Sequence, residues 1–514
     1  MSRSSRSTAG AGDPGGVGAG RPDEGRGARD RLRILYVASE VAPFAKTGGL
    51  ADVAGALPQA LARLGHDVRV VMPLYRGVPS VAGPLRVAVP RVTVPIGDRI
   101  VEGTVLEGRL GSDVPAYFVA QDGYYDRPAL YGASDDCERF IFFCRSILAA
   151  LPQLGWLPQV VHANDWQAGL LPVYLETLYR DTPAYADVAT VFTVHNLAYQ
   201  GVFWHYDLPM TGLGWDLFTP AGLEFYGHLS LLKGGLVFAD LLTTVSPTYA
   251  REIQSPEFGE RMDGVLRERS ADLTGILNGL DVQAWNPATD PDLPKRYDRD
   301  DLDGKAACTA ALRSEIGLPD SGRRTPLVGV VSRLAEQKGI DLVAGAVPAI
   351  RAAGGQLVVL GSGEEPLERL LGELALAHPE SVAVRIGFDE HLARRIYAGA
   401  DFFLMPSRYE PCGLGQLIAL RYGTVPVVRR TGGLTDTVRP WTGAAGAGTG
   451  FLFDELSAEA CGAALARAFA VHADPAAWRH LVGNGMAADF SWDASAESYV
   501  TCYRRAVRKA RRHA

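Results

Sequence analysis

The sequence lacks the patterns that mark several large classes of protein. Its six cysteines form no C-x-x-C pair and its ten histidines include no H-E-x-x-H motif, so the sequence indicates no zinc site. No apolar run approaches the roughly 20 residues that a membrane helix needs. Six cysteines in 514 residues are typical of reduced thiols rather than of a disulfide framework. We therefore expect a cytoplasmic protein that spans no membrane and binds no metal.

The chain also lacks an excess of positive charge. The net charge is −7 and the pI is about 5.9, which argues against nucleic acid or an anionic membrane as the main partner. The exception is the stretch from residue 504 to 512, which holds six lysines and arginines. We expect this stretch to be the solvated end of a helix over residues 492–514, where the helix dipole favours cations. Binding to an acidic partner is the alternative.

The first 30 residues have almost no apolar side chains. They contain eight glycines and five arginines, and Val17 is their only large aliphatic residue. Such a segment cannot bury enough apolar surface to fold, so we expect a disordered extension. An organelle transit peptide is the alternative, although transit peptides are poor in acidic residues and this segment has four.

The rest of the chain repeats one pattern twice. Short β-branched runs alternate with stretches of helical periodicity, which is typical of βαβ units and parallel sheets. The expected strands of the first half are 32–38, 68–72, 116–120, 160–163, 190–194 and 241–245. Those of the second half are 327–331, 356–360, 382–386, 402–405, 425–428 and 451–453. Residues 86–109 instead alternate around Gly97-Asp98 and predict an inserted hairpin.

This pattern predicts two consecutive doubly wound α/β domains, residues 31–277 and 278–490, followed by the helix at the end. In open α/β sheets, ligands bind beyond the carboxyl ends of the strands. Two such domains that face each other form a deep cleft, so we expect the reaction to take place between them.

Two glycine pairs, each between an expected strand and a helix, are candidates for anion binding. In Lys46-Thr47-Gly48-Gly49 the glycines let the backbone approach a ligand, N–H groups at a helix start attract anions, and Lys46 adds a charge. The segment is not a P-loop, and a tight turn without a ligand is the alternative. The segment Thr431–Thr437 has the same design and predicts a second nest of N–H groups.

Charged side chains follow the strands of the second half. Arg333 and Lys338, five residues apart after strand 327–331, can converge on one diphosphate and stabilise it as a leaving group. Ordinary surface charges are the alternative. Glu410, after strand 402–405, is placed to accept hydrogen bonds from sugar hydroxyls. In the first half, Asp165 and His195 each fall beyond the end of a strand.

Together these segments resemble the bacterial glycogen synthases and plant starch synthases, in the family's order, from about residue 32 to 505. The matching motifs are Lys46-Thr47-Gly48-Gly49-Leu50-Ala51-Asp52, His162-Ala163-Asn164-Asp165-Trp166, Thr193-Val194-His195-Asn196, Asn278-Gly279-Leu280-Asp281, Ser332-Arg333 with Gln337-Lys338-Gly339, Pro406–Leu414 with its Glu410-Pro411-Cys412-Gly413-Leu414, and Gly432-Gly433-Leu434-x-Asp436-Thr437-Val438. One mild departure is Phe388, where relatives often carry Tyr near the adenine.

The resemblance implies the GT-B fold, two Rossmann-like domains across a deep cleft, and a hexosyltransferase that needs no cofactor. It implies transfer of glucose from ADP-glucose to the non-reducing end of an α-1,4-glucan, glycogen, with retention of configuration. The final helix, within residues 491–514, would cross back to the first domain. The implied catalytic residues are His195, Asp165, Arg333, Lys338 and Glu410. The implied donor-binding residues are Lys46, Gly48, Gly49, Asn278, Phe388, Cys412, Gly413, Leu414 and Thr435.

Several alternatives stay open at this point. The residues alone do not distinguish ADP from UDP, and they indicate no oligomeric state or allosteric control. Retention could use a carboxylate nucleophile, but the sequence offers no obvious carboxylate pair, so we favour a front-face route in which the departing phosphate takes the proton. Another GT-B glycosyltransferase, a phosphorylase or a non-catalytic glucan-binding protein are the competing functions.

Overall fold

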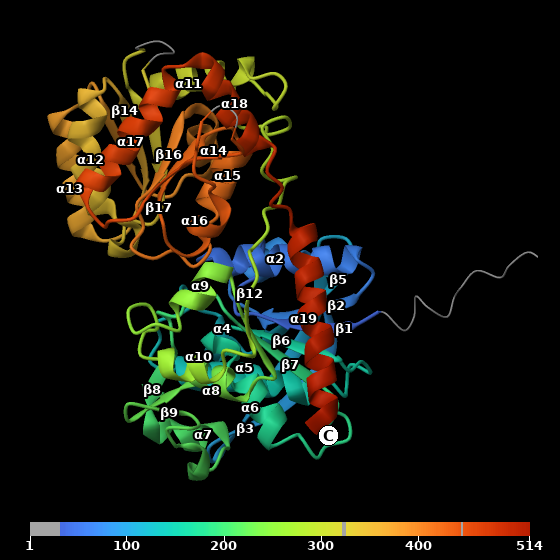
Figure 1. Cartoon of the computed structure of the whole chain (residues 1–514). Coiled ribbons are helices and arrows are strands. Elements are labelled where there is room, and N and C mark those ends of the chain that lie inside the picture. Colours follow the sequence, from blue (N-terminus) through green and yellow to red (C-terminus); the bar gives the residue numbers. More distant parts are fainter. Residues whose placement is uncertain (1–30, 321–324, 444–445, 514) are drawn as a thin grey trace, which may run out of the picture.

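The computed structural model describes residues 31–320, 325–443 and 446–513. The predicted disordered extension, residues 1–30, lies outside the described residues. Two lobes are visible in Figure 1, each built on its own sheet. We call the part around the nine-stranded sheet the first lobe and the part around the six-stranded sheet the second lobe. The buried core of the second lobe begins at Leu280, directly after the last chain segment of the first.

The central strands of the first lobe are parallel and buried on both faces, which explains their continuous apolar runs. The sheet order is β12-β11-β7-β6-β1-β2-β5-β4-β3. The strands are β1 (Arg33–Val37), β2 (Asp67–Pro73), β3 (Arg86–Ile96), β4 (Arg99–Leu110), β5 (Val114–Ala120), β6 (Val160–Asn164), β7 (Ala189–Val194), β11 (Leu241–Thr244) and β12 (Leu273–Gly275).

The predicted hairpin is present as β3 and β4, and Gly97 at its turn has a φ of 55°, which favours glycine. The hairpin does not stand apart from the domain. Its strand β4 pairs antiparallel with β5 and extends the main sheet by two strands.

Helices and a small second sheet surround the first lobe's main sheet. The helices are α2 (Gly49–Arg63), α3 (Val78–Ala82), α4 (Asp122–Tyr125), α5 (Asp136–Ala150), α6 (Leu170–Thr177), α7 (Leu208–Thr211), α8 (Leu231–Phe238), α9 (Pro247–Glu252) and α10 (Asp263–Glu268). The small sheet has the order β8-β10-β9, with β8 (Val202–Trp204), β9 (Glu224–Phe225) and β10 (His228–Ser230).

The second lobe has a wholly parallel sheet in the order β15-β14-β13-β16-β17-β18. Its strands are β13 (Leu327–Val331), β14 (Gln356–Gly361), β15 (Val382–Ile386), β16 (Phe402–Met405), β17 (Val425–Arg429) and β18 (Phe451–Phe453), each within one residue of its predicted bounds. Its helices are α11 (Asp303–Ile316), α12 (Ile340–Ala352), α13 (Glu365–Ala377), α14 (Glu390–Gly399), α15 (Gly415–Arg421), α16 (Gly432–Thr437), α17 (Ala458–His472) and α18 (Pro475–Met486).

The strand order of each sheet reverses at one point, where the first strand of the lobe lies next to a later one. In the first lobe that point lies between β1 and β6, and in the second it lies between β13 and β16. Helices leave toward opposite faces there, so a crevice opens beyond the carboxyl ends of the two strands. The segments that follow these four strands carry most of the predicted site residues.

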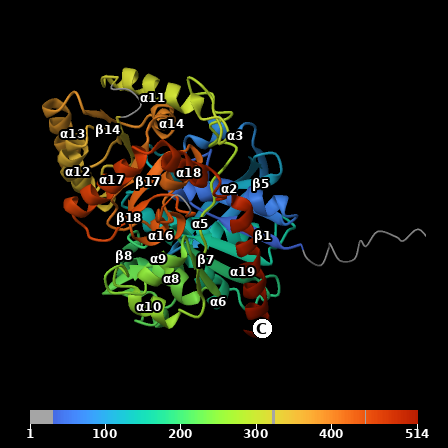
Figure 2. The same cartoon turned by 45° about the horizontal axis from the view of Figure 1, so that its top comes forward.

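Helix α19 (Trp492–His513) returns from the second lobe and packs along α2 and β7 of the first (Figure 1; Figure 2). Its stripe of buried residues, including Trp492, Tyr499 and Tyr503, joins the core of the first lobe. Two of the cations near its end, Arg505 and Lys509, lie 3.4 and 2.6 Å from Asp272 of that lobe. Part of the basic run is therefore paired within the molecule.

Within the ranges that the structure describes, no helix is long and apolar enough to cross a membrane. The same residues hold no group of three or more histidines, cysteines, aspartates or glutamates placed to bind a metal ion. All six cysteines are free and buried.

Candidate active site

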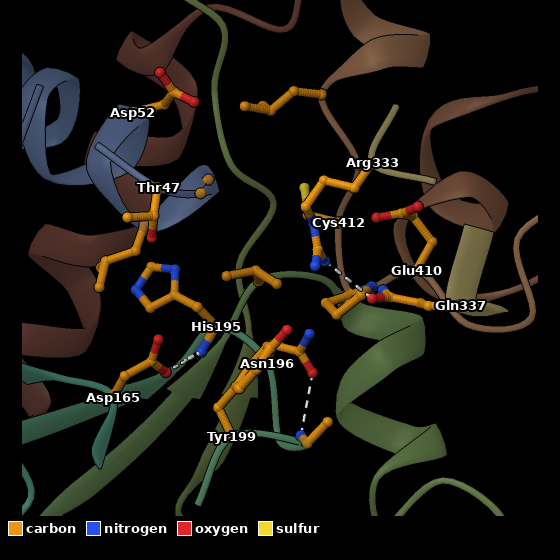
Figure 3. A pocket seen from close by; sticks show the side chains of 18 of the residues that line it. Thr47, Asp52, Asp165, His195, Asn196, Tyr199, Arg333, Gln337, Glu410 and Cys412 are labelled. Atoms are coloured by element: carbon orange, nitrogen blue, oxygen red, sulfur yellow. Dashed lines mark hydrogen bonds between the residues drawn. The ribbon is translucent and has the colours of Figure 1, made fainter. Parts of the chain in front are cut away.

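A cavity of about 1060 Å³ lies between the lobes at the carboxyl ends of the strands that flank both reversal points. Figure 3 shows side chains of the two lobes facing each other across it. Twelve of the predicted residues line it: Lys46, Gly48, Gly49, Asp165, His195, Asn278, Arg333, Lys338, Glu410, Cys412, Gly413 and Leu414. The predicted cleft between two domains is therefore present, and residues that are distant in sequence line it.

An ion pair forms the second-lobe wall. Lys338 Nζ lies 2.7 and 2.9 Å from the two carboxylate oxygens of Glu410, which is 4% exposed. Ser407 Oγ donates a third hydrogen bond to Glu410 at 3.0 Å. The sequence predicted separate roles for Lys338 and Glu410, and it did not indicate that each neutralises the other.

Arg333 differs from Lys338 because its charge is free. Its guanidinium is exposed to the cleft, and it donates a hydrogen bond to Gln337 Oε1 at 3.3 Å (Figure 3). No carboxylate among the described residues pairs with it. An anion that enters the cleft therefore meets an uncompensated cation beside the Lys338–Glu410 pair.

The loop after Glu410 is where the lobes touch. Cys412 is buried and packs with the core of the first lobe, and Ser246 Oγ of that lobe donates to Pro411 O at 2.7 Å. Gly413 has a φ of 75°, a conformation that favours glycine and turns the chain into α15. Asn278, at the crossing between the lobes, leaves its buried Oδ1 without a hydrogen-bond partner among the described residues.

The first glycine nest already holds an anion, and that anion comes from the protein. The carboxylate of Glu40 accepts hydrogen bonds from the backbone N–H groups of Thr47 and Gly48 and from Thr47 Oγ1. Lys46 is paired with Asp52 at 2.6 Å. The sequence therefore predicted the nest, but it missed Glu40, which follows strand β1 without any motif of its own.

His195 is held as a neutral ring with a defined tautomer. Asn164 donates through Nδ2 to Val37 O at 2.9 Å, so its Oδ1 is the atom that faces His195 Nε2, also at 2.9 Å. Because Oδ1 only accepts, Nε2 carries the proton and Nδ1 is left as an acceptor. Burial lowers the pKa of His195 to about 3, so the ring is uncharged at neutral pH.

Asp165 braces the loop that carries His195. Its Oδ1 accepts the backbone N–H of His195 at 2.7 Å (Figure 3), and its own φ is 54°. Burial raises the pKa of Asp165 to about 7, against the opposing effect of the backbone hydrogen bonds. This carboxyl group therefore acts on the backbone of the site rather than as a free anion.

Two predicted donor-binding residues do not line the cleft. The side chain of Phe388, between β15 and α14, is 88% exposed. Thr435 lies in α16, which packs against α9 of the first lobe. The backbone N–H of Gly432, at the start of α16, donates to the carboxylate of Glu252 in α9 at 3.0 Å. The second nest thus holds a carboxylate of the other lobe. The buried Oγ1 of Thr435 has no hydrogen-bond partner among the described residues, and its contact with a phosphate stays a prediction.

The contact between α9 and α16 is reciprocal. Asp436 of α16 accepts the backbone N–H of Thr248 at 2.7 Å and its hydroxyl at 2.7 Å. Each helix therefore caps the start of the other with a carboxylate across the boundary between the lobes. Asp436 stands in a matching motif and Glu252 in none, but the sequence predicted neither pairing, because each hydrogen-bond partner lies more than 150 residues away along the chain.

Comparison with known proteins covers nearly the whole chain. Residues 33–268 match the family described as the starch synthase catalytic domain, and residues 325–470 match the glycosyl transferases group 1. Glycogen synthases from Syntrophotalea carbinolica and Desulforudis audaxviator are 53% and 48% identical to the chain. These alignments cover 93% of the chain in both cases, and 99% and 97% of the two relatives.

Solved structures agree with this similarity. The catalytic domain of starch synthase IV from Arabidopsis thaliana, bound to ADP and acarbose, is 35% identical, with a TM-score of 0.87 over 93% of the chain and 100% of that domain. Sucrose-phosphate synthase from Thermosynechococcus elongatus is 20% identical, with a TM-score of 0.58 over 92% of the chain and 99% of that protein, and shares the fold alone.

Proposed function

The chain belongs to the glycogen and starch synthase family, and from this premise we propose that its cleft transfers glucose from ADP-glucose to the non-reducing end of an α-1,4-glucan with retention of configuration. The predictions of this family, of the GT-B fold and of a hexosyltransferase that functions as a glycogen synthase are confirmed. The donor, the acceptor and the roles of single residues are proposals.

One observation carries the proposal: a free cation, Arg333, lies beside a buried Lys338–Glu410 pair and faces a neutral His195 across the cleft. A leaving nucleoside diphosphate develops negative charge, and a fixed cation stabilises that charge in the transition state. The ADP bound by the Arabidopsis relative supports an adenine nucleotide as the donor's leaving group.

We assign the donor to the second lobe, residues 278–490, and the acceptor to the first lobe, residues 31–277, with the helix within 491–514 as part of the first lobe. Arg333 and Lys338 bind the diphosphate, and Glu410 with the backbone of residues 412–414 binds the donor glucose. From the opposite side, the segment 46–49 and Asn278 complete the donor site.

We propose a front-face mechanism for the transfer. Both carboxylate oxygens of Glu410 accept hydrogen bonds from Lys338, and Asp165 accepts backbone N–H groups, so neither carboxylate is free to attack. The bond between the anomeric carbon and the phosphate oxygen breaks as the incoming hydroxyl oxygen bonds to the same face. The hydroxyl proton passes to the departing phosphate oxygen, and His195 presents a neutral ring beside the reacting atoms. Closure of the lobes over the substrates excludes water in this mechanism, because attack by water is the competing reaction.

A panel of ADP-, UDP- and GDP-glucose with glycogen as the acceptor tests this function. We expect ADP-glucose to give the highest kcat/KM and the product to contain only α-linkages by NMR. Equal or better turnover of UDP-glucose contradicts the proposed donor. Release of glucose 1-phosphate from glycogen and inorganic phosphate indicates a phosphorylase, and binding of glycogen without turnover of any donor indicates a non-catalytic protein. We also propose that the enzyme acts in the cytoplasm.

A further inference from the structure

The small sheet β8-β10-β9 of the first lobe has two faces of different character. Trp204 lies opposite His228, and His228 lies opposite Phe225, so these three side chains share one face. Phe203 and Leu229 share the other face. Leu229 is fully buried, whereas Trp204 is 61% exposed, so the first face is the outer one.

Aromatic rings continue from this outer face along the segment that follows β8. Trp204 and Tyr206 have ring centroids 4.7 Å apart, His205 and Tyr206 4.2 Å, and Tyr206 and Trp215 6.2 Å. Trp204, Tyr206 and Trp215 are all at least half exposed. We call these four rings, Trp204, His205, Tyr206 and Trp215, the aromatic platform. In Figure 1 this region, near β8 and α7, lies on the side of the first lobe away from α19.

Packing does not account for the platform. Trp204, Tyr206 and Trp215 belong to none of the hydrophobic cores, although their neighbours Phe203, Leu217 and Phe218 pack against the core of the first lobe. A cluster of large exposed rings of this kind marks a surface that binds something. The indole N–H groups of both tryptophans and the hydroxyl of Tyr206 make no hydrogen bond within the described part of the chain, so these polar groups are available to a ligand.

The charges around the platform favour a neutral ligand. Asp207 and Asp216 directly follow Tyr206 and Trp215 in the sequence, and the one cation nearby, Arg261, stacks over Tyr226 at 5.5 Å, so cations are not in surplus. A polyanion would need a surplus of cations, which this region lacks. Flat rings with polar edges instead match pyranose units, which present an apolar C–H face and a rim of hydroxyls.

The platform is continuous with the cleft. Val202 lines the cleft, and because side chains alternate along a strand it lies on the same face of β8 as Trp204, two residues later. On the inner face of the sheet, the ring of Phe203 lies 5.6 Å from that of Trp166, which also lines the cleft. A polymer whose end enters the cleft along β8 therefore passes from the cleft wall directly onto the outer rings.

We propose that the aromatic platform binds the body of the α-glucan whose non-reducing end is in the cleft. This inference rests on the proposed function for the identity of the polymer. A second contact raises the effective concentration of chain ends at the cleft, so it strengthens the binding of long acceptors and leaves short ones unaffected. The platform thus makes the enzyme selective for polymeric acceptors.

The variant Trp204→Ala/Tyr206→Ala/Trp215→Ala tests the proposal by steady-state kinetics with two acceptors, glycogen and maltotriose. We expect KM for glycogen to rise about tenfold, with kcat and the KM for maltotriose within about twofold of the wild type. The matched control, Ile100→Ala/Leu376→Ala, removes two exposed apolar side chains elsewhere and leaves both acceptors unchanged. The midpoint of thermal unfolding stays the same for all variants, because the replaced side chains lie outside the cores.

Equal losses with both acceptors, or no loss with either, overturn the proposal. Electrophoresis through a gel that contains glycogen gives a readout that needs no turnover: the platform variant migrates faster than the wild type, and an unchanged mobility contradicts the proposal. If no donor supports transfer yet wild-type retardation depends on the platform, the proposed function fails and the platform's glucan binding stands.

The competing possibility is that a second copy of the chain covers the platform, and mass photometry tests it. A wild-type dimer that the variant converts to monomer identifies the platform as a subunit contact and overturns glucan binding.

Discussion

The two walls of the cleft differ in the charged groups that they present. On the first-lobe wall, Lys46 is paired with Asp52, and burial keeps His195 neutral with a pKa of about 3. On the second-lobe wall, Arg333 has no carboxylate partner among the described residues, and it stands beside the buried pair of Lys338 and Glu410. The second lobe therefore supplies the cation that stabilises a departing diphosphate, while the first lobe presents the neutral ring of His195 to the sugar.

This asymmetry has a chemical reason. A glucosyl unit that leaves its phosphate gains positive character at the anomeric carbon, and a cationic imidazolium next to it would oppose that change. A neutral His195, fixed in one tautomer by Asn164, avoids the repulsion and still offers an acceptor at Nδ1. The two walls are complementary because each stabilises a different part of one transition state.

The largest effect on the difference between the two walls is expected when the free cation, Arg333, is removed. We expect Arg333→Ala to lower kcat by about 10²–10³-fold with little change in KM for glycogen, because the leaving-group charge grows toward the transition state. Steady-state kinetics with ADP-glucose measure this. Arg351→Ala, which removes an exposed second-lobe cation paired with Glu380, serves as the control and keeps its kcat. A near-normal kcat in Arg333→Ala means that the diphosphate binds elsewhere.

The buried pair distinguishes binding from nucleophilic catalysis. Glu410→Ala leaves Lys338 and Ser407 without their acceptor, whereas Glu410→Gln keeps one acceptor and nearly the same shape. We expect the Gln variant to retain roughly ten times the kcat of the Ala variant. Parallel kinetics and mass spectrometry of the intact protein check this. Complete inactivation of both variants, with a glucosyl adduct on Glu410 of the wild type, would overturn the front-face mechanism.

A variant in which His195 becomes charged tests whether the neutral ring matters for the transfer. Asn164→Asp puts a carboxylate beside His195 Nε2, which raises the pKa of His195 from about 3 toward neutrality. Below the new pKa the ring is protonated, so kcat falls as the pH decreases and recovers as it increases. We expect a loss of about tenfold at pH 5 relative to pH 8 that the wild type does not show. Asn164→Ser, which adds no charge, is the control. Parallel pH profiles for Asn164→Asp and the wild type contradict the assigned role of a neutral ring.

The smallest effect is expected where the lobes are joined. Glu252→Ala removes the carboxylate that caps α16 from the other lobe, a loss on the order of 0.5–2 kcal/mol for a helix cap. For a typical cap loss of about 1 kcal/mol we expect the donor KM to rise about fivefold, because the arrangement of the lobes that forms the donor site becomes less stable. Donor kinetics and the radius of gyration from X-ray scattering report on it. Glu459→Ala, at the exposed start of α17, is the control. An unchanged KM and radius would show that this contact does not hold the lobes together.

The sequence predicted the sheets well because their strands are buried on both faces. Runs such as Leu327–Val331 are continuously apolar and end in polar or glycine residues, so their bounds differ little from prediction. The same logic located Asp165, His195, Arg333 and Glu410, since each follows such a strand. The strands of the small sheet are two or three residues long, too short for a periodicity, and were therefore not predicted.

The pairings within the site could not be predicted. Glu40 in the first nest, Glu252 in the second and the Lys338–Glu410 pair all depend on which loops meet at a strand end. Motifs identify groups that suit an anion, but they do not reveal that the protein supplies the anion itself. Phe388 and Thr435 were assigned by resemblance alone; neither lines the cavity, and their roles in donor binding stay predictions.

The return of helix α19 has a consequence for how the protein is made. The core of the first lobe includes Tyr499 and Tyr503, which a ribosome adds only after it has synthesised the entire second lobe. Domains otherwise tend to fold in the order of their synthesis. Here the lobe that is translated first cannot cover its apolar groove along α2 and β7 until the second lobe has been synthesised.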